Sequence, residues 1–259
     1  MLKLGNSLSL PTIKTVNYTP IDSITDTPDI WFDAHSQKQR DAQPDGGGVE
    51  TIYNLGILGA AHNGLQPVVD KQPTYDADDA SINWESFLFD GVDDYFDLDD
   101  RYVTSDNFAF ACAFQLGTPS NEAIVGGTTG GLNRLVIYAN SILIRFNGDG
   151  STNAGIQLFT NNTDNGTVSY SFSDKLEVIV LRKDTSDNIH VYNYLGEKIA
   201  YYAADTKTDQ PWEVDRIGHL ANDTSYAGGR IGEWALFRYD IGDADAQTVA
   251  KALYQKWKP

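Results

Sequence analysis

Residues 176–194 read LEVIVLRKDTSDNIHVYNY and form the clearest hairpin pattern of the sequence. An apolar run over 176–183 is followed by a turn of short polar residues, Asp184–Asn188, and by a second strand-forming run over 189–194. Asp, Ser and Asn favour turns because their short side chains bond to nearby backbone amides. The stretch therefore predicts two antiparallel strands.

Further strands are predicted on both sides of this hairpin. Residues 86–98 (SFLFDGVDDYFDL) suggest two short strands around a turn at Gly91. Residues 108–116 (FAFACAFQL) alternate large with small side chains, which predicts a strand with one deeply buried face and an inert, buried thiol at Cys112. Turn-forming residues separate the other runs, which are 123–126, 132–139, 142–146, 155–160, 168–172, 198–203, 215–220 and 229–239. Strands spaced about 8–12 residues apart predict a sandwich or a barrel.

The C-terminal end follows a different period. Beyond Asp243, apolar residues recur at the three- and four-residue spacing of an amphipathic helix. They are Ala246, Val249, Ala250, Leu253, Tyr254 and Trp257. Asp243 is the expected N-cap, and Lys256 and Lys258 lie at the negative C-terminal end of the helix. We expect a helix over 243–257 that packs across the sandwich.

The charge of the chain excludes several classes of protein. The 259 residues include 36 acidic and 19 basic side chains, so the formal net charge is −17 at pH 7. Such a charge repels phosphate backbones and argues against nucleic-acid binding. No apolar run approaches the ~18 residues of a membrane span. The first residues, MLKLGNS, turn polar before a signal peptide could form, so we expect none.

Several stretches resemble the laminin-G-like branch of the concanavalin A-like lectin/glucanase superfamily. They are PDIWFDA (28–34), FDGVDDYFDL (89–98), the hairpin 176–194 with the following Leu195-Gly196, and GGRIGEWALFRY (228–239) before the helix. The resemblance covers about residues 28–259 and implies a jelly-roll sandwich of two antiparallel sheets. We therefore expect an all-β domain over 28–259.

Residues 1–27 are predicted to form an extended N-terminal arm. Three prolines interrupt a polar stretch that has no continuous period of 2 or 3.6 residues, so its order must come from a surface. The residues expected to dock on a partner are Leu8, Leu10, Ile13 and Val16. The opening LGNSL (4–8) on such an arm is similar to that of accessory virion proteins of bacteriophages.

Three functions follow from these resemblances. The leading hypothesis is a non-enzymatic virion protein made in the host cytoplasm, a capsid decoration or fibre protein. Its arm would dock on phage capsid or tail proteins. The alternative is a glycan-binding adhesin or lectin module that attaches to cell-surface glycans. The third is a glycoside hydrolase or polysaccharide lyase.

The sequence offers no catalytic motif. Hydrolases on this fold that resemble the laminarinase type carry Glu-x-Asp-x-(x)-Glu on one strand, because side chains two residues apart share a face. The seven Glu residues of this chain are isolated from one another, and Glu233, beside Trp234, is the single one worth testing. No serine-nucleophile or phosphate-binding motif occurs, and the four His residues lack metal-ligand spacing. We predict that the protein is not an enzyme.

Two candidate binding sites remain. Six Asp residues lie between positions 90 and 100, and Asp90, Asp93 and Asp94 are the candidate ligands for calcium, which prefers oxygen. Strand periodicity would place Asp93 and Asp94 on opposite faces, so a solvated acidic turn is the alternative. No cofactor is required by the sequence, and calcium is the one candidate ion. Glycan contacts are predicted in polar loops with aromatic residues, at Trp212, Tyr226, Asn222 and Asp223, with Tyr201 and Tyr202 as further candidates.

Overall fold

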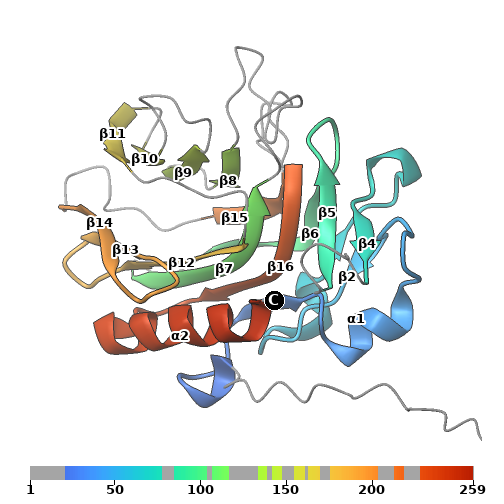
Figure 1. The fold of residues 1–259 in the computed structure, drawn as a ribbon, viewed down its shortest axis with the longest axis horizontal. Coiled ribbons are helices and arrows are strands. Elements are labelled where there is room, and N and C mark those ends of the chain that lie inside the picture. Colours follow the sequence, from blue (N-terminus) through green and yellow to red (C-terminus); the bar gives the residue numbers. More distant parts are fainter. Residues whose placement is uncertain are drawn as a thin grey trace, which may run out of the picture.

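The protein is an antiparallel β-sandwich with one long C-terminal helix (Figure 1). The structure is a computed structural model, and it describes residues 21–77, 85–103, 107–116, 134–138, 142–147, 155–160, 163–169, 176–203, 213–218 and 228–258. The predicted fold class is confirmed. The four predicted docking residues of the arm, Leu8, Leu10, Ile13 and Val16, and the predicted strand 123–126 lie outside the described residues.

One layer is an eight-stranded sheet. Its strands run in the order β14-β13-β12-β7-β16-β5-β4, and β1 pairs with β16 as well. Their bounds are β1 Ile30–Asp33, β4 Thr74–Asp76, β5 Ser86–Asp90, β7 Phe108–Leu116, β12 Leu176–Lys183, β13 Ile189–Tyr192, β14 Lys198–Tyr202 and β16 Gly228–Phe237. The predicted hairpin 176–194 thus supplies β12 and β13, and β14 forms one edge of the sheet.

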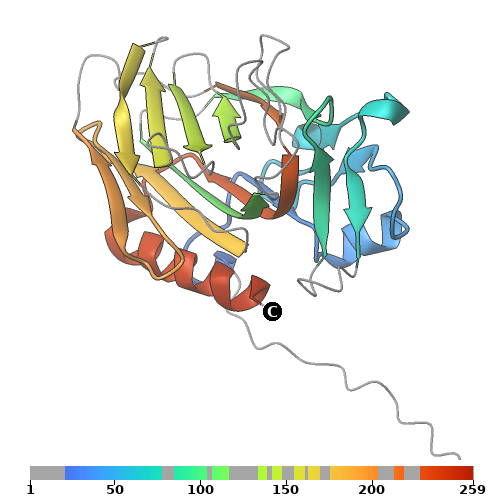
Figure 2. The same cartoon turned by 45° about the horizontal axis from the view of Figure 1, so that its top comes forward.

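The second layer consists of two four-stranded sheets. One has the order β11-β10-β9-β8 and the other β15-β6-β3-β2, and β8 contacts β15. The bounds are β2 Thr51–Ile52, β3 Gly64–Leu65, β6 Phe96–Val103, β8 Arg134–Tyr138, β9 Ile142–Asn147, β10 Gly155–Thr160, β11 Thr163–Ser169 and β15 Glu213–Ile217. Strand β11 therefore begins earlier than the predicted strand 168–172. Figure 2 shows β8 to β11 lying over the large sheet.

Aromatic side chains join the two layers. Phe87 and Phe89 project from β5 of the large sheet, and Phe96 projects from β6 of the second layer. The Phe96 ring centroid lies 6.0 Å from that of Phe87 and 5.9 Å from that of Phe89, with the rings edge to face. Such pairs add to the free energy gained by burying the rings. This contact holds together the end of the sandwich that carries the candidate cation site.

Strand β7 is buried on both faces, which corrects the prediction of one buried face. Every residue from Phe108 to Phe114 is fully buried. The second layer covers one side of the large sheet, and the long helix α2 (Gly242–Trp257) packs on the other, against β12 and β7. The prediction of a buried thiol at Cys112 is confirmed, and burial raises its pKa well above the ordinary value.

Helix α2 presents the predicted apolar face to the sheet. Ala246, Val249, Ala250, Leu253 and Trp257 are buried. The predicted N-cap is wrong, because the helix begins at Gly242 and Asp243 lies in its first turn. The Asp243 carboxylate instead accepts hydrogen bonds from Arg182 and Tyr192 of the hairpin. Asp243 therefore links α2 to β12 and β13 through these hydrogen bonds.

Residues 21–27 pack on the sandwich although the sequence assigned them to an extended arm. Ile21–Ser23 form a 3-10 helix, η1, and Ile21 is buried in the main core. The Thr25 and Tyr239 hydroxyls are hydrogen-bonded at 3.2 Å. The shorter helices are α1 (Gln37–Ala42), η2 (Gly59–His62) and η3 (Val69–Lys71). Within the described residues no helix is long and apolar enough to cross a membrane.

Candidate functional site

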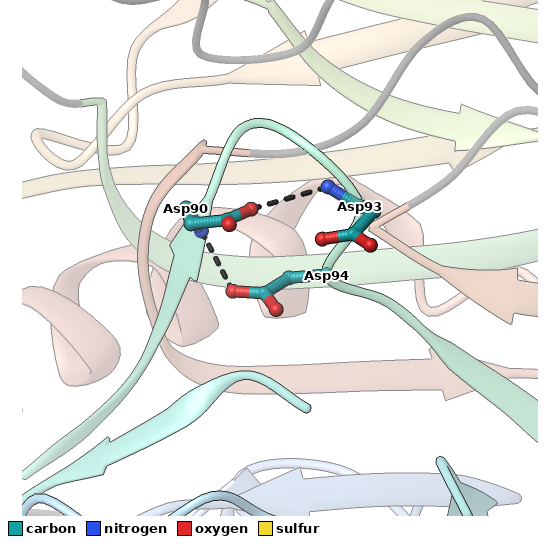
Figure 3. A group of neighbouring side chains, drawn as sticks. All are labelled: Asp90, Asp93 and Asp94. Carbon is teal, nitrogen blue, oxygen red and sulfur yellow. Dashed lines mark hydrogen bonds between the residues drawn. The ribbon is translucent and has the colours of Figure 1, made fainter. Parts of the chain in front are cut away.

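The turn between β5 and β6 brings three carboxylates together (Figure 3). Gly91 adopts a φ of +80°, and this left-handed conformation, which glycine favours, lets the chain reverse directly after Asp90. The Asp90 Oδ1 atom accepts from the backbone N–H of Val92 at 2.7 Å and of Asp93 at 3.2 Å. The Asp94 Oδ2 atom accepts from the backbone N–H of Asp90 at 2.8 Å.

These three side chains converge, which the period of a strand did not predict. One carboxylate oxygen from each of Asp90, Asp93 and Asp94 lies within 4.8 Å of the other two. Strand periodicity separates Asp93 from Asp94, but both residues belong to the turn before β6 begins at Phe96. Three clustered carboxylate oxygens offer the hard ligands that Ca²⁺ takes in proteins. Calcium binding itself stays a prediction.

Asp94 is the buried carboxylate of the group. It is 5 % exposed, whereas Asp90 is exposed. Burial raises the Asp94 pKa to about 6, the backbone N–H of Asp90 opposes this shift, and the negative charges of Asp90 and Asp93 add to it. Above pH 6 the folded protein therefore keeps a buried negative charge beside two others. A bound cation would relieve this repulsion.

Replacing Asp94 tests this electrostatic cost. In Asp94→Asn the side-chain oxygen still accepts from Asp90, but the buried charge is gone. Folding raises the pKa of the wild-type carboxyl from 3.8 to about 6, so the protonated group stabilises the folded state. This stabilisation is fully present below pH 4 and is lost as the pH rises through 6. We expect the free energy of unfolding of Asp94→Asn to equal that of the wild type near pH 4 and to be higher by about 1–3 kcal/mol at pH 8. Urea unfolding in EDTA at both pH values measures the difference, and an equal free energy of unfolding at pH 8 would contradict it.

Glu233 is enclosed in a structural cluster and does not reach solvent. It is 1 % exposed, and its Oε1 accepts from the Trp31 indole at 2.8 Å. Its Oε2 accepts from the Trp257 indole at 2.8 Å and from the Lys256 ammonium at 2.6 Å. Lys256 also binds Asp33 Oδ2 at 2.6 Å. Burial raises the pKa of Glu233, while the positive charge of Lys256 opposes the shift. Glu233 thus has the structural role that its position beside Trp234 allowed.

The predicted glycan residues Trp212, Tyr226, Asn222 and Asp223 lie outside the described residues. The two further tyrosines are described, and Tyr201 is 53 % exposed whereas Tyr202 is partly buried. Both stand on β14, the edge strand beside the hairpin. Tyr201 contacts Asn188 of the turn Asp184–Asn188 and His190 of β13. The sequence predicts this turn only as the connection between two strands.

Comparison with known proteins supports the fold class. No family model matches the chain, and no curated protein sequence matches it. Among solved structures, a Trypanosoma rangeli sialidase in complex with sialic acid is similar with a TM-score of 0.51 and 9 % identity. That alignment covers 88 % of this chain and 33 % of the sialidase. At 9 % identity this likeness shows the fold alone.

Two smaller proteins are also similar to this chain, at lower TM-scores. The carbohydrate-binding module CBM40 of the Ruminococcus gnavus IT-sialidase, bound to α2,3-sialyllactose, has a TM-score of 0.42 and 15 % identity over 64 % of this chain and 96 % of the module. The heptameric SAP-like pentraxin of Limulus polyphemus has a TM-score of 0.42 and 11 % identity over 58 % of this chain and 74 % of the pentraxin.

Proposed function

We propose that this protein is a non-catalytic, glycan-binding module of the lectin type. The observation that supports a non-catalytic role is the environment of Glu233. Its carboxylate is buried and hydrogen-bonded to Lys256 and two indoles, so it can serve a substrate neither as an acid nor as a nucleophile. The glycan part is supported by the sandwich fold and by the exposed aromatic and polar groups at the edge of the large sheet.

A glycan array probed with the full chain tests the proposal. We expect saturable binding to a limited set of glycans and no release of reducing sugar from the bound ones over hours. Absence of binding to every glycan would overturn the proposal. Release of reducing sugar that disappears in Glu233→Gln would instead support the hydrolase hypothesis.

Calcium at the Asp90–Asp94 turn is a part of this proposal that can be tested separately. We expect Ca²⁺ to raise the melting temperature of the wild type relative to EDTA, because the cation offsets the repulsion among three carboxylates. Asp93→Asn should lose this rise, since it removes one oxygen ligand. Asp99→Asn is the matched control, because Asp99 is an exposed acid outside the group. An equal response of the two variants would remove calcium from the proposal.

A second candidate function is docking on a phage particle through the N-terminal arm. It is favoured by the burial of Ile21 and the contact of Thr25 with Tyr239, because these fix the root of the arm to the sandwich. A partner bound by residues 1–20 would then hold the whole domain. Co-sedimentation of full-length protein and of the 1–20 deletion with bare phage heads tests this role. Equal sedimentation of both forms would contradict it.

The position of the truncation has its own expected effect. Deleting residues 1–20 should leave the free energy of unfolding of the domain unchanged within about 0.5 kcal/mol. Deleting residues 1–27 also removes the buried Ile21 side chain and should cost about 2–4 kcal/mol. Chemical unfolding of the two truncated forms measures the difference. Equal stabilities would show that η1 contributes nothing to the core.

A further inference from the structure

An exposed tyrosine is held in a fixed orientation at the edge of the large sheet. Tyr201 on β14 lies directly opposite His190 on β13, and the two ring centroids are 5.2 Å apart. The Tyr201 hydroxyl donates to Asn188 Oδ1 at 2.9 Å. Tyr201 nevertheless remains 53 % exposed, and it is the one aromatic among the large apolar side chains that are exposed in the described part of the chain. A ring fixed in this way loses little further conformational entropy when a ligand packs on it.

The neighbouring turn is itself rigid. The Asp184 carboxylate accepts from the backbone N–H of Ser186 at 2.8 Å and of Asn188 at 3.0 Å, and its Oδ2 is 2.8 Å from His190 Nε2. Although burial opposes it, the hydrogen bonds from His190, Asn188 and Ser186 hold the pKa of Asp184 at about 2. Asp184 is therefore charged at neutral pH and fixes both the turn and the histidine that lies beside Tyr201.

The same turn offers polar groups that its own contacts leave available. Thr185 and Ser186 are exposed, and among the described residues their hydroxyls have no hydrogen-bond partner. The Tyr201 hydroxyl oxygen donates its proton to Asn188 and can still accept a hydrogen bond. An exposed aromatic face with hydroxyl groups nearby suits a sugar, whose ring packs its C–H groups on the aromatic face while its hydroxyls bond at the rim.

The charges at the turn select among sugars. Asp184 and Asp187 supply two carboxylates. Lys183, the last residue of β12, is fully buried and bound to Asp187 Oδ1 at 2.9 Å, and His190 Nε2 lies 2.8 Å from Asp184 Oδ2. A sugar carboxylate would therefore meet two carboxylates here, whereas the basic side chains bound to them, Lys183 and His190, are buried. A neutral sugar meets no such cost.

We propose that Tyr201 and the Asp184–Asn188 turn form a subsite for a neutral pyranose, which stacks on the exposed tyrosine ring and bonds to the hydroxyls at its edge. This inference rests on the proposed glycan-binding function and names its location and the class of sugar. It assigns a binding role to a turn on the hairpin edge, away from the carboxylates of the β5–β6 turn.

Titration of the full chain with defined oligosaccharides tests the subsite. The probes are lactose, cellobiose and laminaritetraose as neutral sugars and 3′-sialyllactose as the acidic one, with NMR shifts of the tyrosine rings as the readout. We expect at least one neutral probe to bind and 3′-sialyllactose to bind no better than lactose. In Tyr201→Ala the affinity should fall more than tenfold, whereas Tyr201→Phe, which keeps the ring, should lose about threefold or less. Leu195→Ala is the matched control and should bind like the wild type, because Leu195 is an exposed apolar residue in the turn that precedes β14.

Each other outcome has a distinct meaning. If a neutral sugar binds and Tyr201→Ala binds it equally well, the subsite is overturned while the glycan-binding function stands. If 3′-sialyllactose binds more tightly than lactose and this advantage is lost in Tyr201→Ala, the selection for neutral sugars is overturned. If the protein binds none of these oligosaccharides and no glycan of the array, both the proposed function and the subsite are overturned. Tyr201→Ala should keep the wild-type melting temperature within a few degrees, which ensures that a loss of binding is local.

Discussion

Replacing Lys256 by Met is expected to lower the free energy of unfolding by about 3–5 kcal/mol. The Lys256 side chain is 6 % exposed, and its ammonium lies 2.6 Å from both Asp33 Oδ2 and Glu233 Oε2. Burial lowers the pKa of Lys256, but the two carboxylates outweigh it and hold the pKa above its ordinary value. Methionine fills a similar volume but leaves two buried carboxylates without their cation.

Urea unfolding at pH 7 measures this loss. The matched control is Lys258→Met, two residues further along, because Lys258 is exposed and should change the stability by no more than about 0.5 kcal/mol. Acidification should partly rescue Lys256→Met, since burial raises the pKa of Glu233 and protonation of this group removes one of the uncompensated charges. A loss below 1 kcal/mol, or no difference from the control, would show that the cluster contributes little to stability.

Phe110→Ala is expected to cost about 3–5 kcal/mol through the cavity it leaves. Phe110 is fully buried in β7 and stands between Leu181 of β12 and Leu236 of β16 in the sheet register. Its ring centroid lies 5.3 Å from that of Trp234, edge to face. Because neighbours on both flanking strands are held by the sheet, the space can collapse only in part.

Chemical unfolding with a tryptophan fluorescence readout measures the effect. Val69→Ala is the apolar control, because Val69 is 74 % exposed on η3 and its truncation should shift the stability by less than about 0.5 kcal/mol. Phe110→Leu should recover more than half of the loss, since leucine refills most of the volume. Equal stabilities of Phe110→Ala and the wild type would contradict the packing of β7 at the centre of the core.

Local patterns predicted most strands and the helix but not how their faces are covered. The hairpin 176–194 and the apolar spacing of residues 246–257 each carry their own period, so both could be found without a partner. The burial of both faces of β7 could not be found in this way, because it depends on α2, which comes from the far end of the chain. The position of Asp243 was missed for a similar reason, since Arg182 and Tyr192 reach it only in the folded molecule.

The candidate sites, too, could be predicted only as far as local sequence determines them. The types of residue at positions 90, 93 and 94 indicated a group of candidate calcium ligands, and the structure brings their carboxylates together. Their convergence was missed because strand periodicity was extended past Gly91 into the turn. Calcium binding by this group stays a prediction. Glu233 could not be separated from a catalytic acid by its neighbours in sequence, because the deciding partner, Lys256, is 23 residues away. The sequence named Tyr201 as a further candidate for glycan contact, but its contacts with Asn188 and His190 depend on the register of β13 and β14.

The Lys256–Asp33 contact joins residues 223 positions apart in the sequence. Strand β16, which β1, β5 and β7 all flank, also comes late in the chain. During synthesis on a ribosome, β1, β5 and β7 therefore cannot pair with β16 until residues 228–257 have emerged, and the edges that they present to β16 stay unpaired until then. Such non-local pairing gives slow folding, on the order of milliseconds to seconds. We expect nascent chains halted before residue 228 to be sensitive to protease and to bind chaperones, and protection to appear only once α2 has left the exit tunnel.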